Sequence, residues 1–181
     1  KKWLNWDHKN GLGAPYEIVE KDNHQITGRL KGKHHSNQMS DLPNTESSSY
    51  RPNYIVSMHI DKANRLWIGT WGAGLSLFDL KTRVFRNYTV QDGLPGNYIL
   101  SINEGPAGNL WIGSNNGLSQ FNGTLFNNYS KINGLISNHV FSIAFDSNRF
   151  LWVGGHHGMT QLKIDPVSKK LFHLDSYLNE N

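Results

Sequence analysis

Asn97-Tyr98-Ile99-Leu100-Ser101-Ile102, followed at residues 110–113 by Leu-Trp-Ile-Gly, is the stretch of sequence that decides the fold. The first string has counterparts at residues 53–58 and 138–143, and the second recurs at 66–69 and 151–154. In all three copies the Trp lies 14 positions after the leading Asn, without a gap. The three Trp residues recur at intervals of 44 and 41 residues, which is the length of one four-stranded propeller blade.

Each copy of the repeat predicts four strands. The first strand is a mostly apolar run, which suits an innermost strand covered on both sides. The expected ranges are 55–60, 99–103 and 140–145 for strand A, 66–69, 110–113 and 151–154 for strand B, and 75–79, 118–122 and 159–163 for strand C. Strand D carries Phe-x-x-Tyr at 85–88 and 126–129, whereas the third copy has Phe172 and then Asp175 in place of the Tyr. We therefore predict an all-β protein, a β-propeller of four-stranded antiparallel blades of 41–44 residues that forms part of a larger ring.

Gly-Leu pairs mark the exit from each blade. They follow strand D at residues 93–94 and 134–135, and the same phrase occurs at 11–12 after Trp3 and Trp6. Residues 1–12 are therefore expected to be the outer strand and exit turn of a preceding blade. Three blades are predicted at 53–96, 97–137 and 138–181. Residues 13–52 lack the Trp and contain a long polar run, so they are either a degenerate blade or an insertion.

Composition excludes several classes of function. The net charge is +4, and no run of Lys or Arg exceeds two residues, so the sequence does not favour nucleic-acid binding. Cysteine is absent, which excludes disulfides and thiolate metal sites. No apolar run approaches the roughly 20 residues of a membrane span, so none is expected within this segment.

The repeated strand B residues are expected to be structural. Trp67, Trp111 and Trp152 could form a platform for sugars, but their fixed place in every copy favours packing between blades. A glycine follows each Trp by two positions and should allow the backbone of a neighbour to come close. These glycines are Gly69, Gly113 and Gly154.

The loops between strands B and C differ between copies, so they are the candidate ligand-binding site. The candidate residues are Trp71, Asn115, Asn116, His156 and His157. The alternative for the Asn pair is that it only suits the turn geometry. Adjacent His residues point apart and have no third ligand nearby, so no metal site is predicted, and no cofactor is expected.

No catalytic residue can be identified in the sequence. Asp61 and Asp146 precede their Trp by six positions, which differs from the spacing of sialidase Asp-box turns, and the second copy has Gly105 there. Paired carboxylates, a nucleophile elbow and a phosphate loop are also not found. We therefore expect a protein that is not an enzyme.

The string at residues 64–70, Asn-Arg-Leu-Trp-Ile-Gly-Thr, and its counterpart at 108–118 resemble the two-component regulator propeller repeat, as does the linker at 88–97. The resemblance covers residues 53–175, and residues 1–12 by the exit turn alone. It implies the periplasmic sensor part of bacterial histidine kinases, hybrid two-component systems or diguanylate cyclases. In gut Bacteroidetes, many such sensors respond to oligosaccharides.

Three functions remain open at this stage. The resemblance favours a non-catalytic ligand-sensing segment that is carbohydrate-responsive and periplasmic. Its partners would be an oligosaccharide or another small ligand, and either a second copy or the remainder of a longer chain. The alternatives are a propeller lyase-type enzyme and a structural scaffold for protein interactions.

Overall fold

The fold was analysed in a computed structural model, which describes residues 11–14, 54–165 and 170–178. The described residues form three four-stranded antiparallel sheets. The first sheet contains β1 (Ile55–Ile60), β2 (Arg65–Thr70), β3 (Leu75–Asp79) and β4 (Phe85–Tyr88). The second contains β5 (Ile99–Glu104), β6 (Leu110–Ser114), β7 (Gly117–Phe121) and β8 (Phe126–Tyr129). The third contains β9 (Val140–Phe145), β10 (Leu151–Gly155), β11 (Gly158–Ile164) and β12 (Leu171–Leu178).

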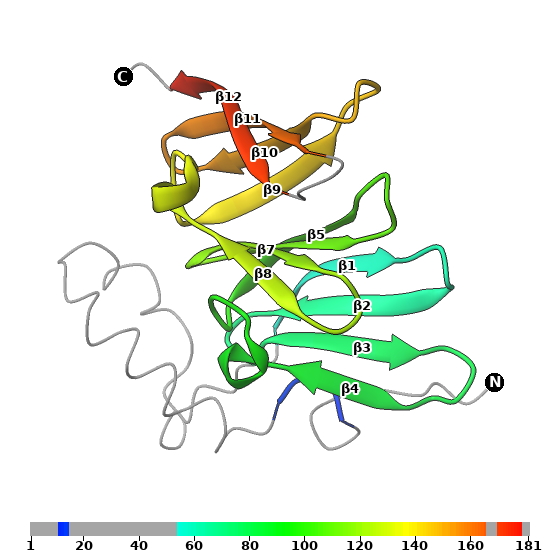
Figure 1. The fold of residues 1–181 in the computed structure, drawn as a ribbon. Coiled ribbons are helices and arrows are strands. Elements are labelled where there is room, and N and C mark those ends of the chain that lie inside the picture. Colours follow the sequence, from blue (N-terminus) through cyan, green and yellow to red (C-terminus); the bar gives the residue numbers. More distant parts are fainter. Residues whose placement is uncertain (1–10, 15–53, 166–169, 179–181) are drawn as a thin grey trace, which may run out of the picture.

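Strand order within each sheet follows the sequence, so each sheet is one meander. The three sheets are stacked face to face, and the inner strands β1, β5 and β9 lie side by side (Figure 1). This is the radial packing of propeller blades, and the predicted fold class is confirmed. The strand ranges agree with the prediction to within a residue or two at their ends, except in β12.

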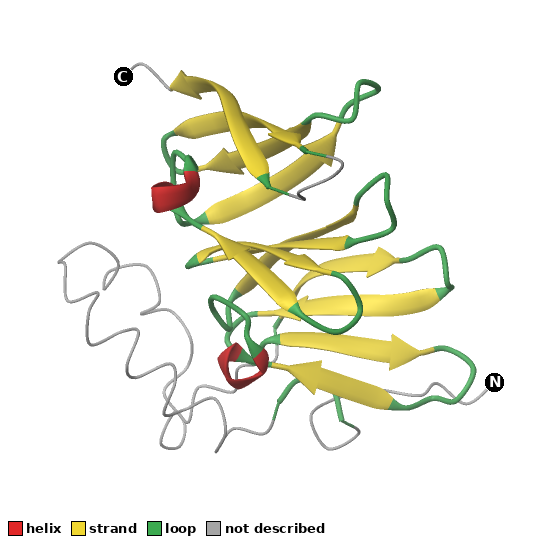
Figure 2. Ribbon diagram, in the orientation of Figure 1, coloured by secondary structure: helices red, strands yellow, loops and turns green. Residues whose placement is uncertain are grey.

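Two short 3-10 helices, η2 (Val90–Asp92) and η3 (Lys131–Asn133), occupy the links from one blade to the next. Both lie on the same side of the stack, together with the loops between strands B and C (Figure 2). The turns from A to B and from C to D lie on the opposite side. We call these two sides the B–C face and the A–B face.

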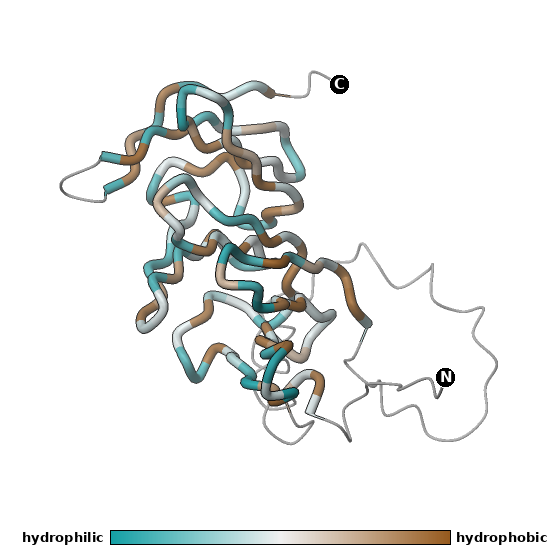
Figure 3. The backbone as a smooth tube through the Cα atoms, turned by 90° about the vertical axis from the view of Figure 1, so that its right-hand side faces the viewer, coloured by the Kyte–Doolittle hydropathy of each residue, from teal (hydrophilic) through white to brown (hydrophobic). Residues whose placement is uncertain are grey.

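The hydrophobic cores lie between blades rather than within one sheet. One cluster joins Trp67, Leu75 and Tyr88 of the first blade to Ile99 and Ile112 of the second. A second cluster joins the second and third blades in the same way. Its buried members are Trp111, Leu118, Leu135, Val140, Ile143, Leu151, Val153 and Leu162. Hydrophobic and hydrophilic stretches alternate along the chain accordingly (Figure 3).

The exit turns dock on the outer strand of the blade that follows. The side-chain amide of Asn128 donates to Gly93 O at 2.8 Å, and that of Asn87 donates to Gly11 O at 3.0 Å. Leu12 is buried against Ile68 of the first blade. Gly11 and Leu12 thus contact the first described blade much as Gly93 and Leu94 contact the second. The expected outer strand and the interpretation of residues 13–52 lie outside the described residues, apart from Gly13 and Ala14.

The predicted pattern of the third outer strand is wrong. A register shift in β12 leaves Leu174 unpaired, so Tyr177 rather than Asp175 lies opposite Met159 and takes the Tyr position. His173 lies opposite Leu162 and takes the Phe position, whereas Phe172 is 51% exposed. A bulge adds a residue to one strand of a pair without changing its partner, and the spacing of a sequence motif does not show this.

Candidate functional site

The five candidate residues lie on the B–C face, on loops held by the ends of the inner strands. The Trp71 N–H donates to Tyr54 O at 2.8 Å, and the Asn115 N–H donates to Tyr98 O at 3.1 Å. Each bond ties a B–C loop to the residue before strand A of its own blade. The loop backbones of the first two blades are therefore fixed, and their side chains vary on a repeated frame.

Trp71 offers an aromatic surface to solvent. Its side chain is 39% exposed, although large apolar residues are usually buried in a core. The ring meets that of Tyr98 edge to face, with centroids 5.3 Å apart. Trp71 belongs to the first blade and Tyr98 to the second, so this aromatic pair bridges two blades at the face.

The side chains of Asn115 and Asn116 differ in their hydrogen bonding. The Asn116 side-chain amide donates to Pro95 O at 2.8 Å, which fixes it against the link between the first two blades. The Asn115 Oδ1 is buried and has no hydrogen-bond partner among the described residues. A buried acceptor without a partner is costly, and a water or a ligand hydroxyl could satisfy it. This side chain lies close to Gly96, in the same link.

His156 and His157 are exposed on the third blade, and the structure places His156 in an aromatic group. Its ring lies 4.7 Å from the rings of both His139 and Phe141. Burial, together with the charge that His156 can carry, lowers the pKa of His139 below its usual value. His139 therefore stays neutral at pH 7. Within the described ranges, no group of three His, Cys, Asp or Glu could hold a metal ion.

The candidate residues thus fall into two groups. Trp71 and Asn115 meet through Tyr98, and Asn116 joins them at the Pro95 link. His156 and His157 form the second group, with His139 and Phe141. Sequence reasoning missed Tyr98 and His139, although the signal was present. Both follow the leading Asn of their repeat, where Tyr54 stands in the first copy.

Two of the three strand B tryptophans are packed between blades. Trp67 and Trp111 are each 1% exposed and stack on Tyr88 and Tyr129 of their own blades. Trp152 is half-buried, because the described residues place no blade against its outer face. A Cβ on Gly113 would lie 2.6 Å from Val140 Cγ1 of the next blade, so only glycine permits this approach.

Two carboxylates accept hydrogen bonds from the indoles, a contact that the sequence analysis missed. Asp61 Oδ2 accepts the Trp67 Nε1–H at 2.8 Å, and Asp146 Oδ2 accepts that of Trp152 at 3.0 Å. Burial raises the pKa of Asp61, but the bonds from Trp67 and Arg65 outweigh it and hold the pKa below its usual value. The Trp152 bond lowers the pKa of Asp146. Both carboxylates therefore carry charge at neutral pH.

Four-stranded blades packed face to face around their inner strands define a β-propeller. A family model described as two component regulator propeller matches residues 49–72, 93–116 and 134–157. Three stretches of the chain, one at each blade, thus match the repeat of the two-component regulator propeller family. A comparison with curated proteins gave no match.

Solved structures share the fold at low sequence identity. Two are named as extracellular domains of hybrid two-component systems from B. thetaiotaomicron, with TM-scores of 0.58 and identities of 22% and 23%. They match 74% and 75% of this chain, which covers 19% and 18% of theirs. A virginiamycin B lyase from Staphylococcus aureus has a TM-score of 0.53 at 13% identity, with 66% of this chain and 40% of the lyase covered. The chain therefore spans about a fifth of the two sensor domains.

No helix in the described part of the chain is long and apolar enough to cross a membrane.

Proposed function

We propose that this chain is a non-catalytic, ligand-sensing propeller segment of a bacterial two-component-type sensor, facing the periplasm and responding to carbohydrate. The three family repeats support the sensor assignment, and the fold likeness to extracellular sensor domains supports the location. Its ligand is an oligosaccharide bound on the B–C face. The remainder of a longer chain, or a second copy, covers the outer blade faces.

The observation that carries the carbohydrate proposal is the contact between the exposed Trp71 ring and the half-buried Tyr98 ring. The Tyr98 carbonyl also holds the backbone of Asn115, whose Oδ1 has no partner among the described residues. Sugar rings offer an apolar face and a rim of hydroxyl groups. Trp71 can stack on the first, and the amides of Asn115 and Asn116 can bond the second. These groups are uncharged, as a neutral glycan site requires. Hydrogen bonds to the residues just before strand A already fix the loop backbone, so binding costs little conformational entropy.

Ligand binding across two blades would change the free energy of one arrangement of the propeller relative to another. An effect on an attached output domain requires that the ligand bind these arrangements with different affinity. The Trp71–Tyr98 contact joins two blades, so a ligand that clamps both rings favours one spacing of those blades. The propeller itself performs no bond chemistry in this scheme.

Calorimetric titration of a panel of neutral oligosaccharides tests this proposal. We expect one class to bind the wild-type chain and to lose its affinity in the double variant Trp71→Ala, Asn116→Ala. The matched control is Val84→Ala, Leu125→Ala, which removes side chains that are 61% and 63% exposed on the A–B face. Equal affinity in all three proteins would place the ligand elsewhere.

Recovery of the ligand after incubation separates sensing from catalysis. A sensor returns the oligosaccharide with unchanged mass, whereas a lyase-type propeller would return cleavage products. Mass spectrometry of the recovered ligand measures this directly. Turnover that disappears when His156 and His157 are replaced by Ala would favour the enzyme.

A further inference from the structure

The turn from strand A to strand B has the same backbone hydrogen bond in all three described blades. The turn of the second blade lacks the carboxylate that the other two contain. In the first and third blades, the turn begins with Asp61 or Asp146. One carboxylate oxygen accepts the N–H of the residue four positions on, at 2.9 Å in both blades. The other oxygen accepts the indole N–H six positions on. The carboxylate therefore closes the turn and also accepts the hydrogen bond of the indole.

In the second blade, the turn keeps the backbone but loses the carboxylate. Gly105 stands where Asp61 and Asp146 stand, and the Gly108 N–H donates to Gly105 O at 2.9 Å, as the corresponding bonds do in the other two turns. Trp111 is 1% exposed. No acceptor for its Nε1–H is found among the residues that the structure describes. The Trp111 Nε1 is not among the buried polar atoms that lack a partner, so its N–H is open to an acceptor that enters from solution.

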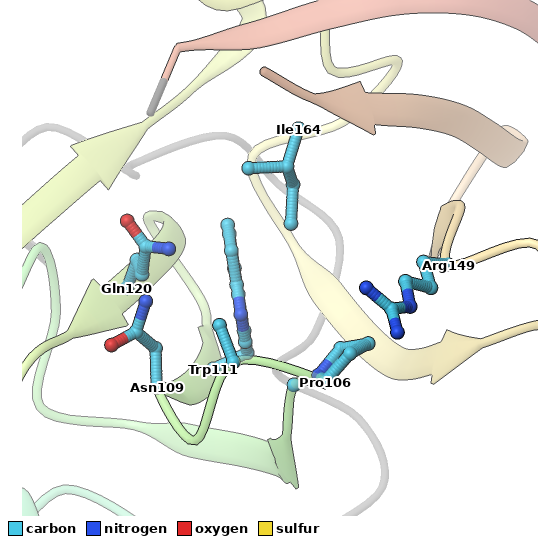
Figure 4. A pocket seen from close by; sticks show the side chains of 8 residues that line it. Pro106, Asn109, Trp111, Gln120, Arg149 and Ile164 are labelled. Atoms are coloured by element: carbon cyan, nitrogen blue, oxygen red, sulfur yellow. The ribbon is translucent and has the colours of Figure 1, made fainter. Parts of the chain in front are cut away.

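A cavity of about 180 Å³ opens at this point on the A–B face. Trp111 lies in the middle of its lining, and the Arg149 guanidinium of the third blade points toward it (Figure 4). Pro106 and Ile164 provide apolar walls, and Gln120 lies beside the indole. The neighbouring acid, Glu104, is turned to the first blade, where it accepts the Lys62 N–H at 3.0 Å.

We propose that this cavity binds a small carboxylate from solution, which takes the place of the missing Asp side chain. One oxygen accepts the Trp111 Nε1–H, and the charge is balanced by the Arg149 guanidinium. The chain itself supplies the precedent, because Asp61 Oδ2 accepts both the Trp67 indole and the Arg65 guanidinium, the latter at 2.7 and 2.8 Å. The first blade thus shows the indole, carboxylate and guanidinium group complete.

The size and the walls of the cavity select a short-chain ligand. Sites for drug-sized molecules occupy roughly 300–1,000 Å³, so this one suits a carboxyl group with a few carbon atoms. Apolar walls favour a hydrocarbon tail over a second charge. This site rests on the turn geometry alone and stands whether or not the B–C face binds a glycan.

Nuclear magnetic resonance of the indole N–H groups tests the proposal on the full 181-residue chain. The Trp111 resonance is assigned by its loss in Trp111→Phe. We expect sodium acetate to move it downfield along a saturable curve, while sodium chloride at the same ionic strength does not. The Trp67 and Trp152 resonances serve as internal references, because their indoles already donate to carboxylates. They should lie downfield at the start and stay there.

Three variants sharpen the test. Arg149→Gln should weaken acetate binding about two- to fivefold, as expected for a partly exposed ion pair. Arg83→Gln is the matched control, because Arg83 is also exposed at positive φ but lies on the first blade. Gly105→Asp should move the Trp111 resonance to the reference position without ligand and abolish the response to acetate. The Trp111 indole has to shift slightly in this variant, since a Cβ on Gly105 would lie 2.8 Å from Nε1.

Lengthening the ligand from acetate to propionate should tighten binding by up to about fourfold, the value of one buried methylene. Sulfate that saturates the Trp111 shift equally well would overturn the choice of carboxylate. An indole resonance that does not move, or that moves without saturation, would overturn the site itself. Equal affinity in Arg149→Gln and Arg83→Gln would show that the Arg149 guanidinium does not contribute to acetate binding.

Discussion

The rings of Trp71 and Tyr98 meet at 88°, with centroids 5.3 Å apart, and they come from neighbouring blades. Tyr98 is therefore the support that holds the exposed Trp71 ring in place. We expect Tyr98→Ala to weaken oligosaccharide binding about two- to tenfold, since an edge-to-face pair contributes about 0.5–1.5 kcal/mol. Tyr98→Phe keeps the ring and should bind like the wild type. Calorimetry on both variants measures the effect, and equal losses would indicate a role for the hydroxyl instead.

The two most buried tryptophans should carry much of the stability. Replacing Trp111 by Ala removes a side chain packed between two blades, and we expect it to lower the free energy of unfolding by about 3–5 kcal/mol. Trp152→Ala is the matched comparison, because Trp152 has the same repeat position but is half-buried. Its cost should be clearly smaller in urea unfolding. Equal costs would count against packing between blades as the role of this residue.

Asp61 should make stability depend on pH in the acid range. Its folded pKa lies below the ordinary value of 3.8, so its contribution is complete above that value and is lost as the pH falls through the folded pKa. At pH 7, Asp61→Asn should lower the free energy of unfolding by about 1–3 kcal/mol, the range for bonds to a charged group. The difference from wild type should shrink below pH 4. A difference that is constant from pH 7 to pH 3 would contradict this.

The outer face of the third blade should promote self-association. Met159 is 43% exposed, whereas Leu75 and Leu118 at the same repeat position are fully buried by the blade that follows them. We expect the sedimentation coefficient of the chain to rise with concentration. Met159→Lys should weaken this association, and Val84→Lys, on an exposed turn, should not. A monomer at every concentration, with a closed ring in its structure, would refute the expectation.

The sequence was sufficient for most of the fold because packing between blades repeats the same residues at the same spacing. Trp67, Trp111 and Trp152 fixed the blade length, and the apolar runs fixed the inner strands. The position of Tyr177 could not be predicted from the sequence, because the bulge at Leu174 changes the strand pairing and no sequence motif indicates the bulge.

The candidate site was harder to predict from the sequence than the fold. Loop variation indicated the B–C face, but contacts such as Trp71 with Tyr98 join different blades and depend on their angle. The hydrogen bonds between Asp and indole were not predicted, because the spacing between Asp61 and Trp67 was compared only with that of the sialidase Asp box. The missing carboxylate at Gly105 could not be interpreted from the sequence, because it depends on all three turns sharing one backbone conformation.

The bonds at the two ends of the undescribed stretch converge on one loop. The Ala14 N–H donates to Ala73 O at 3.1 Å, and Trp71 donates to Tyr54 O. Without residues 15–52, the chain would read Gly-Leu-Gly-Ala-Asn-Tyr from residue 11, which parallels Gly-Leu-Pro-Gly-Asn-Tyr at 93–98. We therefore expect residues 15–52 to be an insertion in a link rather than a blade.

Joining Ala14 directly to Asn53 tests this, and the shortened chain should keep its unfolding transition in a thermal melt. Loss of folding would show that the stretch is part of the sheet architecture. Gly11 and Leu12 dock on the first described blade without a blade between them. On this expectation, the exit turn at Gly11 and Leu12 leads directly into the blade that begins at β1, and the link between them can lengthen without adding a blade to the propeller.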